Sequence, residues 1–443
     1  ISSLRNNEKI DNANYDFQLE TEEFLDLSLF EEYEDNLIDT LSSAFKNNSK
    51  INAERASLES AKQDVNISRG EFLPSITLSG DTSTQQDTDR INQSGEPLSD
   101  TDSTPKNRSV LIEQKVFDGF GNYNSLQKSK LELEYAKFEL NKLEQEVLLS
   151  AAKAYYTLAY NFKNLEFNQS NVELFERQVE SDRARLERGE ISLTDFAQSE
   201  SSLAGAQANL ITATNELISG KKSFQKIIGS KAPDEIDLSF FPDLKIPTSL
   251  STATAISEQI NPRLNLAKID LEIAKKELFV ARGDLAPSAK ISYSRKKNED
   301  LSTTVDEREQ EEVKATITWP IFKGGKQISS VKKAKFRVEE KQLIFDDVLD
   351  QVKIDTANAW TTYKASKGVL DATSAQLKAA EIANEGITLE YETGNKRTTL
   401  EVIQSRTLLL DARTSYAKAQ KNLAIAHFNL LASIGDLYLD NIK

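Results

Sequence analysis

The chain has 443 residues, 28% of them charged, and a formal net charge of -15 at pH 7. This acidic balance argues against nucleic-acid binding, because phosphate contacts need a basic face. The chain has no cysteine, which excludes thiolate metal sites. Because it has only one histidine as well, catalytic pairs of a nucleophile and a base are nearly excluded. We therefore expect no enzyme and no cofactor. No run of about 18 apolar residues is present that could form a membrane-spanning helix.

The first half of the chain is predicted to follow the order helix, strand, loop, strand, very long helix, turn and helix. Its first helical pattern extends from about Leu37 to Arg69 and stops before Pro74, because proline cannot continue a helix and favours extended geometry in its predecessor. Before this pattern, the acidic stretch 1–35 is expected to form a weakly ordered N-terminal arm. The elements predicted for this first repeat, 36–229, are strands at about 75–83 and 109–117 with a polar loop covering most of 80–107, a long helix 122–188 and a helix 193–229.

The last helix of this half carries a seam of small and apolar residues. Steps of three and four residues continue without a break, which is typical of a helix that packs lengthwise on another helix. The same register returns 206 residues later, so we predict an internal duplication. The seam positions are Phe196, Ser199, Leu203, Ala206, Leu210, Ala213, Leu217, Gly220, Phe224 and Ile227, and then Val402, Ser405, Leu409, Ala412, Tyr416, Ala419, Leu423, Ala426, Leu430 and Ser433.

The second half repeats the same order of elements after a proline-containing linker at 230–250. Its helix-to-strand break, at Arg282 and Pro287, copies the spacing of the break in the first half. The charged stretch 298–312 is predicted to be a loop. The elements predicted for this repeat, 251–435, are a first helix, strands at about 288–296 and 313–322, a long helix 326–393 and a helix 399–434, followed by a C-terminal tail at 436–443.

Helices of this length cannot bury their apolar stripes in one globule, so we expect them to lie side by side in a bundle or cylinder roughly 100 Å long. The strands have the length of membrane-barrel strands, about 9–11 residues, and lipid does not tolerate open sheet edges. Four strands are too few to enclose a lumen, whereas three copies of the chain would supply twelve. The alternative is a soluble or envelope-attached coiled-coil scaffold with hairpins on its surface.

Motifs at the helix-to-strand and strand-to-helix junctions resemble the TolC-type outer membrane efflux family. The Arg-x-x-x-x-Pro break occurs in both halves, and the strand exits at 114–119 and 319–325 are similar to the family's Gln-Pro-Leu-Phe-Asp-Gly-Gly. The resemblance covers roughly 36–443. It implies a homotrimer whose twelve-stranded β-barrel, with four strands per chain, lies in the outer membrane and continues into a long α-helical periplasmic barrel. It also implies a periplasmic adaptor and an inner-membrane transporter as partners in exporting drugs or proteins from a Gram-negative-type cell.

The resemblance places the periplasmic tip at the turns that follow the two long helices. In relatives this turn is centred on a glycine with mostly apolar neighbours, and the adaptor contacts it; here the turns are more charged. A glycine that only ends a helix would explain the same positions. The predicted adaptor-contacting residues are Arg188, Gly189, Glu190, Thr393, Gly394 and Asn395.

Just inside the tip, relatives hold the tunnel shut with polar links between neighbouring helices. By this resemblance Asp195 is expected to pair with a cation and to accept a hydrogen bond from Tyr391. Either Lys396 or Arg397 could supply the cation, because one inserted residue leaves the alignment ambiguous. Ordinary solvated surface charge is the alternative for each position. The predicted gate residues are Thr194, Asp195, Tyr391, Lys396, Arg397, Glu401, which aligns with an acidic ring, and Gln404, which replaces a second acid.

Overall fold

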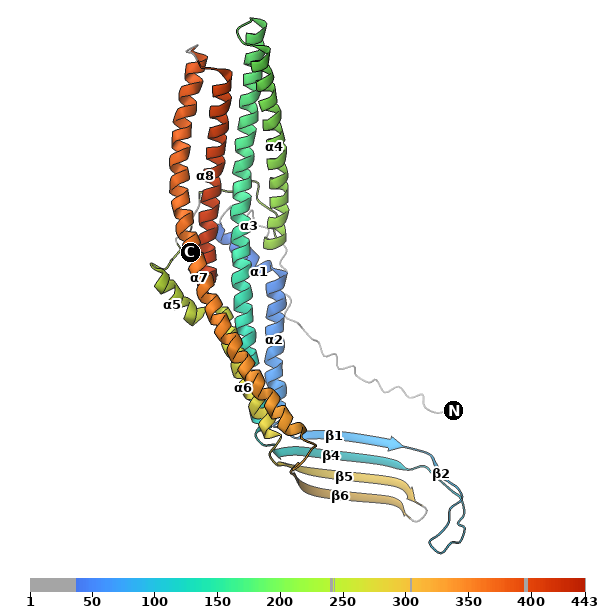
Figure 1. The fold of residues 1–443 in the computed structure, drawn as a ribbon. Helices are drawn as coiled ribbons and strands as arrows, with labels where there is room; N and C mark the ends of the chain where they lie inside the picture. The colour runs from blue at the N-terminus through green and yellow to red at the C-terminus, as the bar shows by residue number, and fades with distance from the viewer. Residues whose placement is uncertain (1–36, 240–241, 243, 303–304, 394–396, 443) are drawn as a thin grey trace, which may run out of the picture.

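The computed structural model describes residues 37–239, 242, 244–302, 305–393 and 397–442. The expected N-terminal arm, 1–35, lies outside these residues. Helices form a long rod, and a four-stranded sheet lies at one end of it (Figure 1). None of the helices in the described ranges is both long and apolar enough to span a lipid bilayer.

Two long helical hairpins make up the end of the rod that is far from the sheet (Figure 1). Helices α3 (Gly121–Glu187) and α7 (Lys326–Glu392) have 67 residues each, which corresponds to about 100 Å of helix. After a turn, each chain segment returns as α4 (Leu193–Ile228) or α8 (Thr399–Ile434), with 36 residues each. Every predicted seam position is buried or half-buried, which confirms that the seam is a packing surface.

Shorter helices flank the rod where the hairpins end. They are α1 (Leu37–Asn47) and α2 (Ser49–Gly70) in the first half, and α5 (Leu250–Ile260) and α6 (Pro262–Gly283) in the second. The prediction of one continuous helical pattern to Arg69 was therefore wrong at one point, because the helix is interrupted at Asn48. The second half is interrupted at the equivalent residue, Asn261.

The two asparagines explain the interruptions. The Asn48 side chain accepts a hydrogen bond from the backbone of Lys50 at 2.9 Å, and its amide donates to the carbonyl of Ile227 at the end of α4, at 3.3 Å. Asn261 likewise caps α6 and donates to the carbonyl of Ser433 near the end of α8, at 2.7 Å. An asparagine that bonds to nearby backbone groups competes with helix continuation. Each one therefore starts a new helix and ties it to the end of a hairpin.

The sheet consists of β1 (Ser75–Thr82), β4 (Lys106–Phe117), β5 (Ser288–Ser302) and β6 (Val305–Thr318), antiparallel and in the order β1-β4-β5-β6. Two short strands, β2 (Gln85–Asp87) and β3 (Thr101–Ser103), pair beyond it. Cross-strand pairs place apolar residues together on one face, as with Ile76 opposite Ile112 and Tyr293 opposite Val313. The other face is mainly polar.

The strands of the second half are longer than predicted. The stretch 298–312, expected to be a loop, belongs almost entirely to β5 and β6, and the strand expected to continue to residue 322 ends at Thr318. Opposite charges support the extension, because Arg295 lies 3.4 Å from Glu311 across the pair. At the other end Pro320 has no N–H to donate to a sheet.

The main core lies where the short helices meet the hairpins. Tyr155, Tyr156, Phe224 and Phe428 are its largest fully buried side chains. The segment 436–443, expected to be a tail, contributes two fully buried residues, Leu437 and Ile442, and forms the short 3-10 helix Leu439–Asn441. Residues 437–442 are thus part of the packed centre of the molecule.

Candidate functional site

The first turn of the tip joins α3 to α4 through Gly189, whose φ of +69° is readily adopted by glycine. Its neighbours pair with each other, because the Arg188 guanidinium donates to Glu190 at 2.7 Å. This bond is the main reason why the pKa of the Glu190 carboxyl is lowered. The predicted tip residues of this turn therefore form an exposed, internally paired cluster.

The second turn is described in part. Gly394, Asn395 and Lys396 lie outside the described residues, so their predicted roles stay predictions. Thr393 ends α7 and donates its hydroxyl to the carbonyl of Leu389 at 2.8 Å. The exposed Arg397 bonds to Glu390 at 2.6 Å, and also to Glu401.

Asp195 and Glu401, both predicted gate acids, occupy equivalent helix N-termini. Each closes a capping box, Asp195 with Ser192 and Glu401 with Thr398. The hydrogen bonds from Ser192 lower the pKa of Asp195, and those from Thr398 are the first cause of the lowered pKa of Glu401. Thr194, beside Asp195, is exposed. Within one chain these acids thus start α4 and α8.

Tyr391 bonds to a different carboxylate from the one expected. Its hydroxyl donates to Asp182 Oδ1 at 3.0 Å rather than to Asp195, and lies 3.1 Å from the hydroxyl of Thr399. Since the phenol proton is directed to the carboxylate, Thr399 donates to the phenol oxygen. Burial is the largest cause of the raised pKa of Tyr391, and the Asp182 charge adds to it.

Asp182 is fully buried and receives further hydrogen bonds from neutral donors. The Gln178 amide lies 3.0 Å from both carboxylate oxygens, and the Ser199 hydroxyl donates to Oδ2 at 2.5 Å. We call Gln178, Asp182, Ser199, Tyr391 and Thr399 the tip junction. The junction joins the α3–α4 hairpin to the α7–α8 hairpin through Asp182 and Tyr391, which are 209 positions apart in sequence. Its neutral donors satisfy a buried charge, which is costly to leave unpaired.

Two arginines lie beside the tip junction. The Arg185 guanidinium lies over the Tyr391 ring, 4.7 Å from its centroid. Arg406 reaches from α8 to α3 and donates to the carbonyl of Leu174 at 3.2 Å, and burial lowers its pKa. Both side chains strengthen the contact between the hairpins, and neither was predicted.

The sequence contained one signal for the tip junction that the prediction missed. At the 205-residue offset between α3 and α7, Asp182 corresponds to Ile387 and Gln178 to Ala383. Polar residues at positions where the repeat carries apolar ones indicate a buried polar contact specific to one half. In the described part of the chain, no group of three His, Asp or Glu side chains could hold a metal ion.

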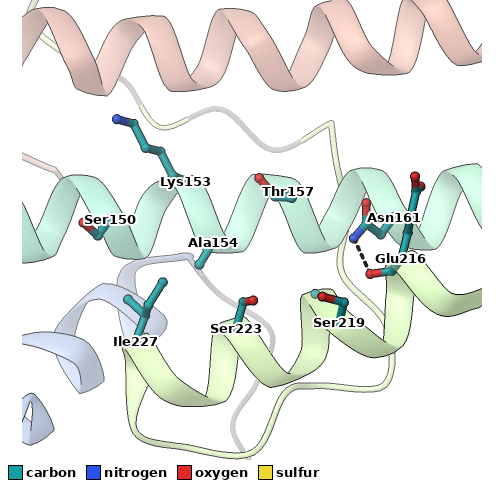
Figure 2. A pocket seen from close by; sticks show the side chains of 10 residues that line it. Ser150, Lys153, Ala154, Thr157, Asn161, Glu216, Ser219, Ser223 and Ile227 are labelled. Atoms are coloured by element: carbon teal, nitrogen blue, oxygen red, sulfur yellow. Dashed lines mark hydrogen bonds between the residues drawn. The ribbon is translucent and has the colours of Figure 1, made fainter. Parts of the chain in front are cut away.

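Two grooves lie between paired helices. One, of about 390 Å³, is lined by α7 and α8 near the tip and includes the predicted gate residues Glu401 and Gln404. The other, of about 540 Å³, lies between α3 and α4 (Figure 2). Here the Asn161 amide donates to the carbonyl of Glu216 at 2.9 Å, and a Cβ at Gly220 would lie 2.7 Å from that amide nitrogen. Because this second groove is about 40 Å along α3 from the turn, it is separate from the tip junction.

A comparison with protein families identifies this architecture. The model of the family described as "Outer membrane efflux protein" matches residues 40–230 and 256–436. The chain belongs to the outer membrane efflux protein family. The two matched segments coincide closely with the two repeats predicted from the sequence.

Individual relatives match this chain over most of its length and over most of their own. The outer membrane efflux protein BepC of Brucella suis is 24% identical over 409 residues, which are 92% of this chain and 87% of BepC. TolC of Escherichia coli is 22% identical over 421 residues, 91% of this chain and 83% of TolC. Among solved structures, the Campylobacter jejuni CmeC outer membrane channel has a TM-score of 0.79 at 16% identity, covering 90% of this chain and 85% of CmeC. The outer-membrane channel OprN has a TM-score of 0.78 at 16% identity, covering 91% of this chain and 90% of OprN.

Family membership sets the orientation of the molecule. Members of this efflux family are outer membrane channels that extend into the periplasm, and the family is one of channels rather than enzymes. The sheet is therefore the membrane end, and the tip junction lies at the periplasmic end of the rod (Figure 1).

Proposed function

We propose that the chain is one protomer of a homotrimeric efflux duct that works with a periplasmic adaptor and an inner-membrane transporter to export small molecules or proteins. The observation that carries this proposal is the sheet, in which β1 and β6 each have one edge without a partner strand in the described chain. Lipid leaves such backbone groups unsatisfied. Pairing of β6 with β1 of the next copy removes both edges, and three copies supply twelve strands.

The two faces of the sheet support the same arrangement. Val313 and Ile317 on the apolar face are 76% and 78% exposed in one chain, as expected of side chains that face lipid. On the opposite face Lys290 bonds to Glu113 at 2.8 Å, as expected of groups that face water. The exposed Trp319, at the end of the sheet near the helices, suits the aromatic belt of a membrane interface.

The gate is proposed to lie at the periplasmic tip, with the tip junction holding the α7–α8 hairpin against α3–α4 in the closed state. Opening separates the hairpins and breaks the bond between Tyr391 and Asp182. Asp195, with Thr194 beside it, is proposed to form a second link to Lys396 or Arg397 of a neighbouring copy. Such exposed pairs are worth about 0–1 kcal/mol each, which suits a closure that must open. Glu401 and Gln404 would line the aperture.

The adaptor is proposed to contact the two turns. Arg188, Gly189 and Glu190 form one contact surface, and Thr393 with Gly394 and Asn395 forms the other. Because the charges of the first turn are exposed and paired with each other, an adaptor with charged groups could exchange partners with them at little cost. The expected adaptor surface is therefore polar at this turn.

Planar bilayers test the duct and its gate together. Purified protein should need detergent for extraction, form trimers and add stepwise ion conductance to the bilayer. A preparation that is monomeric and stable in plain buffer would contradict the proposal. For the gate, Asp195→Ala combined with Tyr391→Phe should raise the conductance above that of the unaltered channel, and an unchanged conductance would count against this closure.

A further inference from the structure

The internal duplication makes the two hairpins comparable residue by residue near the tip. Helices α3 and α7 correspond at an offset of 205 and helices α4 and α8 at 206. In the first hairpin, a groove containing Gln178 and Asp182 is covered by the edge of the second hairpin, from which Tyr391 contributes its hydroxyl. Farther from the turn, Ile403 of that edge is buried against Phe175.

The equivalent groove in the second hairpin is open. Ala383 and Ile387 stand at the positions of Gln178 and Asp182, and both line the 390 Å³ groove between α7 and α8. Gln178 is 5% exposed and Asp182 is 0% exposed, whereas Ala383 is exposed and Ile387 is only half-buried. The same backbone position is thus covered in one repeat and uncovered in the other.

The covering edge is also duplicated, and its first copy is only partly covered in the described chain. Tyr391 and Thr399 correspond to Leu186 and Leu193 of the first hairpin. Thr399 is 5% exposed, but Leu193 is 70% exposed, and Leu186 is half-buried. A partly uncovered apolar edge and a partly uncovered groove therefore lie on different hairpins of one chain. The edge of the first hairpin cannot reach the groove of the second hairpin in the same chain, because the two hairpins already contact each other through the opposite pair of surfaces.

We propose that the groove between α7 and α8 receives the edge of a neighbouring copy, with Leu186 and Leu193 of that copy packing against Ala383 and Ile387. This inference rests on the proposed trimer and names the residues that each copy contributes at the tip. The tip would then hold two kinds of contact in alternation. The contact inside each copy is the polar tip junction, and the groove contact between copies is apolar and separate from the exposed link proposed for Asp195.

The two contacts differ physically in what breaks them. Hydrogen bonds to a buried charge depend on geometry, so a small displacement of Tyr391 is sufficient to lose them. Apolar contacts depend on buried area and are not directional. The tip junction is thus the contact that switches, while the apolar groove contact holds neighbouring copies together during small movements.

Cysteine pairs test this proposal directly, because the chain has no cysteine of its own. A disulfide requires Cβ atoms about 4 Å apart. Full-length protein carrying Leu186→Cys and Ile387→Cys, oxidised in isolated outer membranes, should run on denaturing gels as disulfide-linked dimers and trimers that reductant returns to monomers. The matched control pairs Leu186→Cys with Leu389→Cys, whose position is two residues along α7, on another side of the helix, and 61% exposed. This control should give little linked product.

The outcomes separate this proposal from the trimer itself. An amine-reactive crosslinker applied to the same membranes reports whether trimers are present. Trimers without a disulfide between positions 186 and 387, or equal linkage at position 389, would overturn the proposed contact and leave the trimer intact. Monomers alone would overturn both. Linkage of position 387 to an adaptor instead of a second copy would assign the groove to that partner and overturn the proposal.

Discussion

Replacing Tyr391 with phenylalanine tests whether the tip junction closes the channel. The substitution keeps the ring and removes one hydroxyl, which donates to Asp182 at 3.0 Å and lies 3.1 Å from the Thr399 hydroxyl. A hydrogen bond to a charged group contributes about 1.5–3 kcal/mol. Tyr391 is only half-buried, so we take the lower end, about 1.5 kcal/mol for each copy. At 1.4 kcal/mol per factor of ten, the closed-to-open ratio of each junction should fall about tenfold.

Single-channel recordings in planar bilayers measure this effect as a higher mean conductance or a larger open fraction. The matched control is Tyr416→Phe, which removes the same hydroxyl from the middle of α8, where it accepts a long 3.4 Å hydrogen bond from Gln420. The control should leave conductance unchanged. If Tyr391→Phe behaves like Tyr416→Phe, the bond to Asp182 does not hold the gate and the reasoning fails.

Three further predictions concern the membrane face, the helix interruptions and the capping boxes. Val313→Lys should block assembly in the outer membrane, because Val313 is on the lipid face six residues from the interfacial Trp319, and a lysine there costs about 2–4 kcal/mol near the bilayer midplane. Thr316→Lys on the opposite face should be tolerated, and heat-modifiable gel mobility distinguishes the two variants. Asn261→Ala should lower the free energy of unfolding by about 1–2 kcal/mol, and Asn48→Ala should lower it by less, because the bond from Asn48 to the hairpin is longer. Thermal unfolding in detergent measures both losses, and equal losses would contradict this ranking. Because the folded pKa of Asp195 is lowered, the stability from its capping box is complete above the ordinary pKa of 3.8 and is lost as pH falls through the lowered value. The amide protection factor in the first turn of α4, which corrects for the intrinsic pH dependence of exchange, should therefore fall in acid. Asp195→Asn should remove this dependence, and a dependence that persists in the variant would refute the reasoning.

Much of the local structure could be predicted from the sequence because it depends on residues close together in the chain. The seam from Phe196 to Ile227 specifies a helix that packs along its length, and its repetition specifies a second one in the same order. Pro74 and Pro287 end their helical segments through their own ring geometry. Apolar residues at every second position specify strands with two unlike faces.

Pairings between distant segments limited these predictions. The charged stretch 298–312 has the composition of a loop, and it is extended because Arg295 finds Glu311 on the opposite strand. Likewise, the segment 436–443 is too short to show a periodic pattern that would indicate burial, although half of its residues are apolar. Leu437 and Ile442 are buried because this segment meets α1, and because Gln145 of α3 donates to the carbonyl of Gly435 just before it.

The sequence by itself determined a duplicated chain of long seamed helices and two-faced strands, because these properties follow from periodicities within each segment. The sequence also located the end of the long helix near Tyr391. Only the tertiary structure decided that Asp182 is the partner of Tyr391, since more than two hundred residues separate the groups that meet. A carboxylate on a long charged helix has the same local pattern whether water or a second hairpin covers it, and the packing of α7 and α8 on α3 decides which of these it meets.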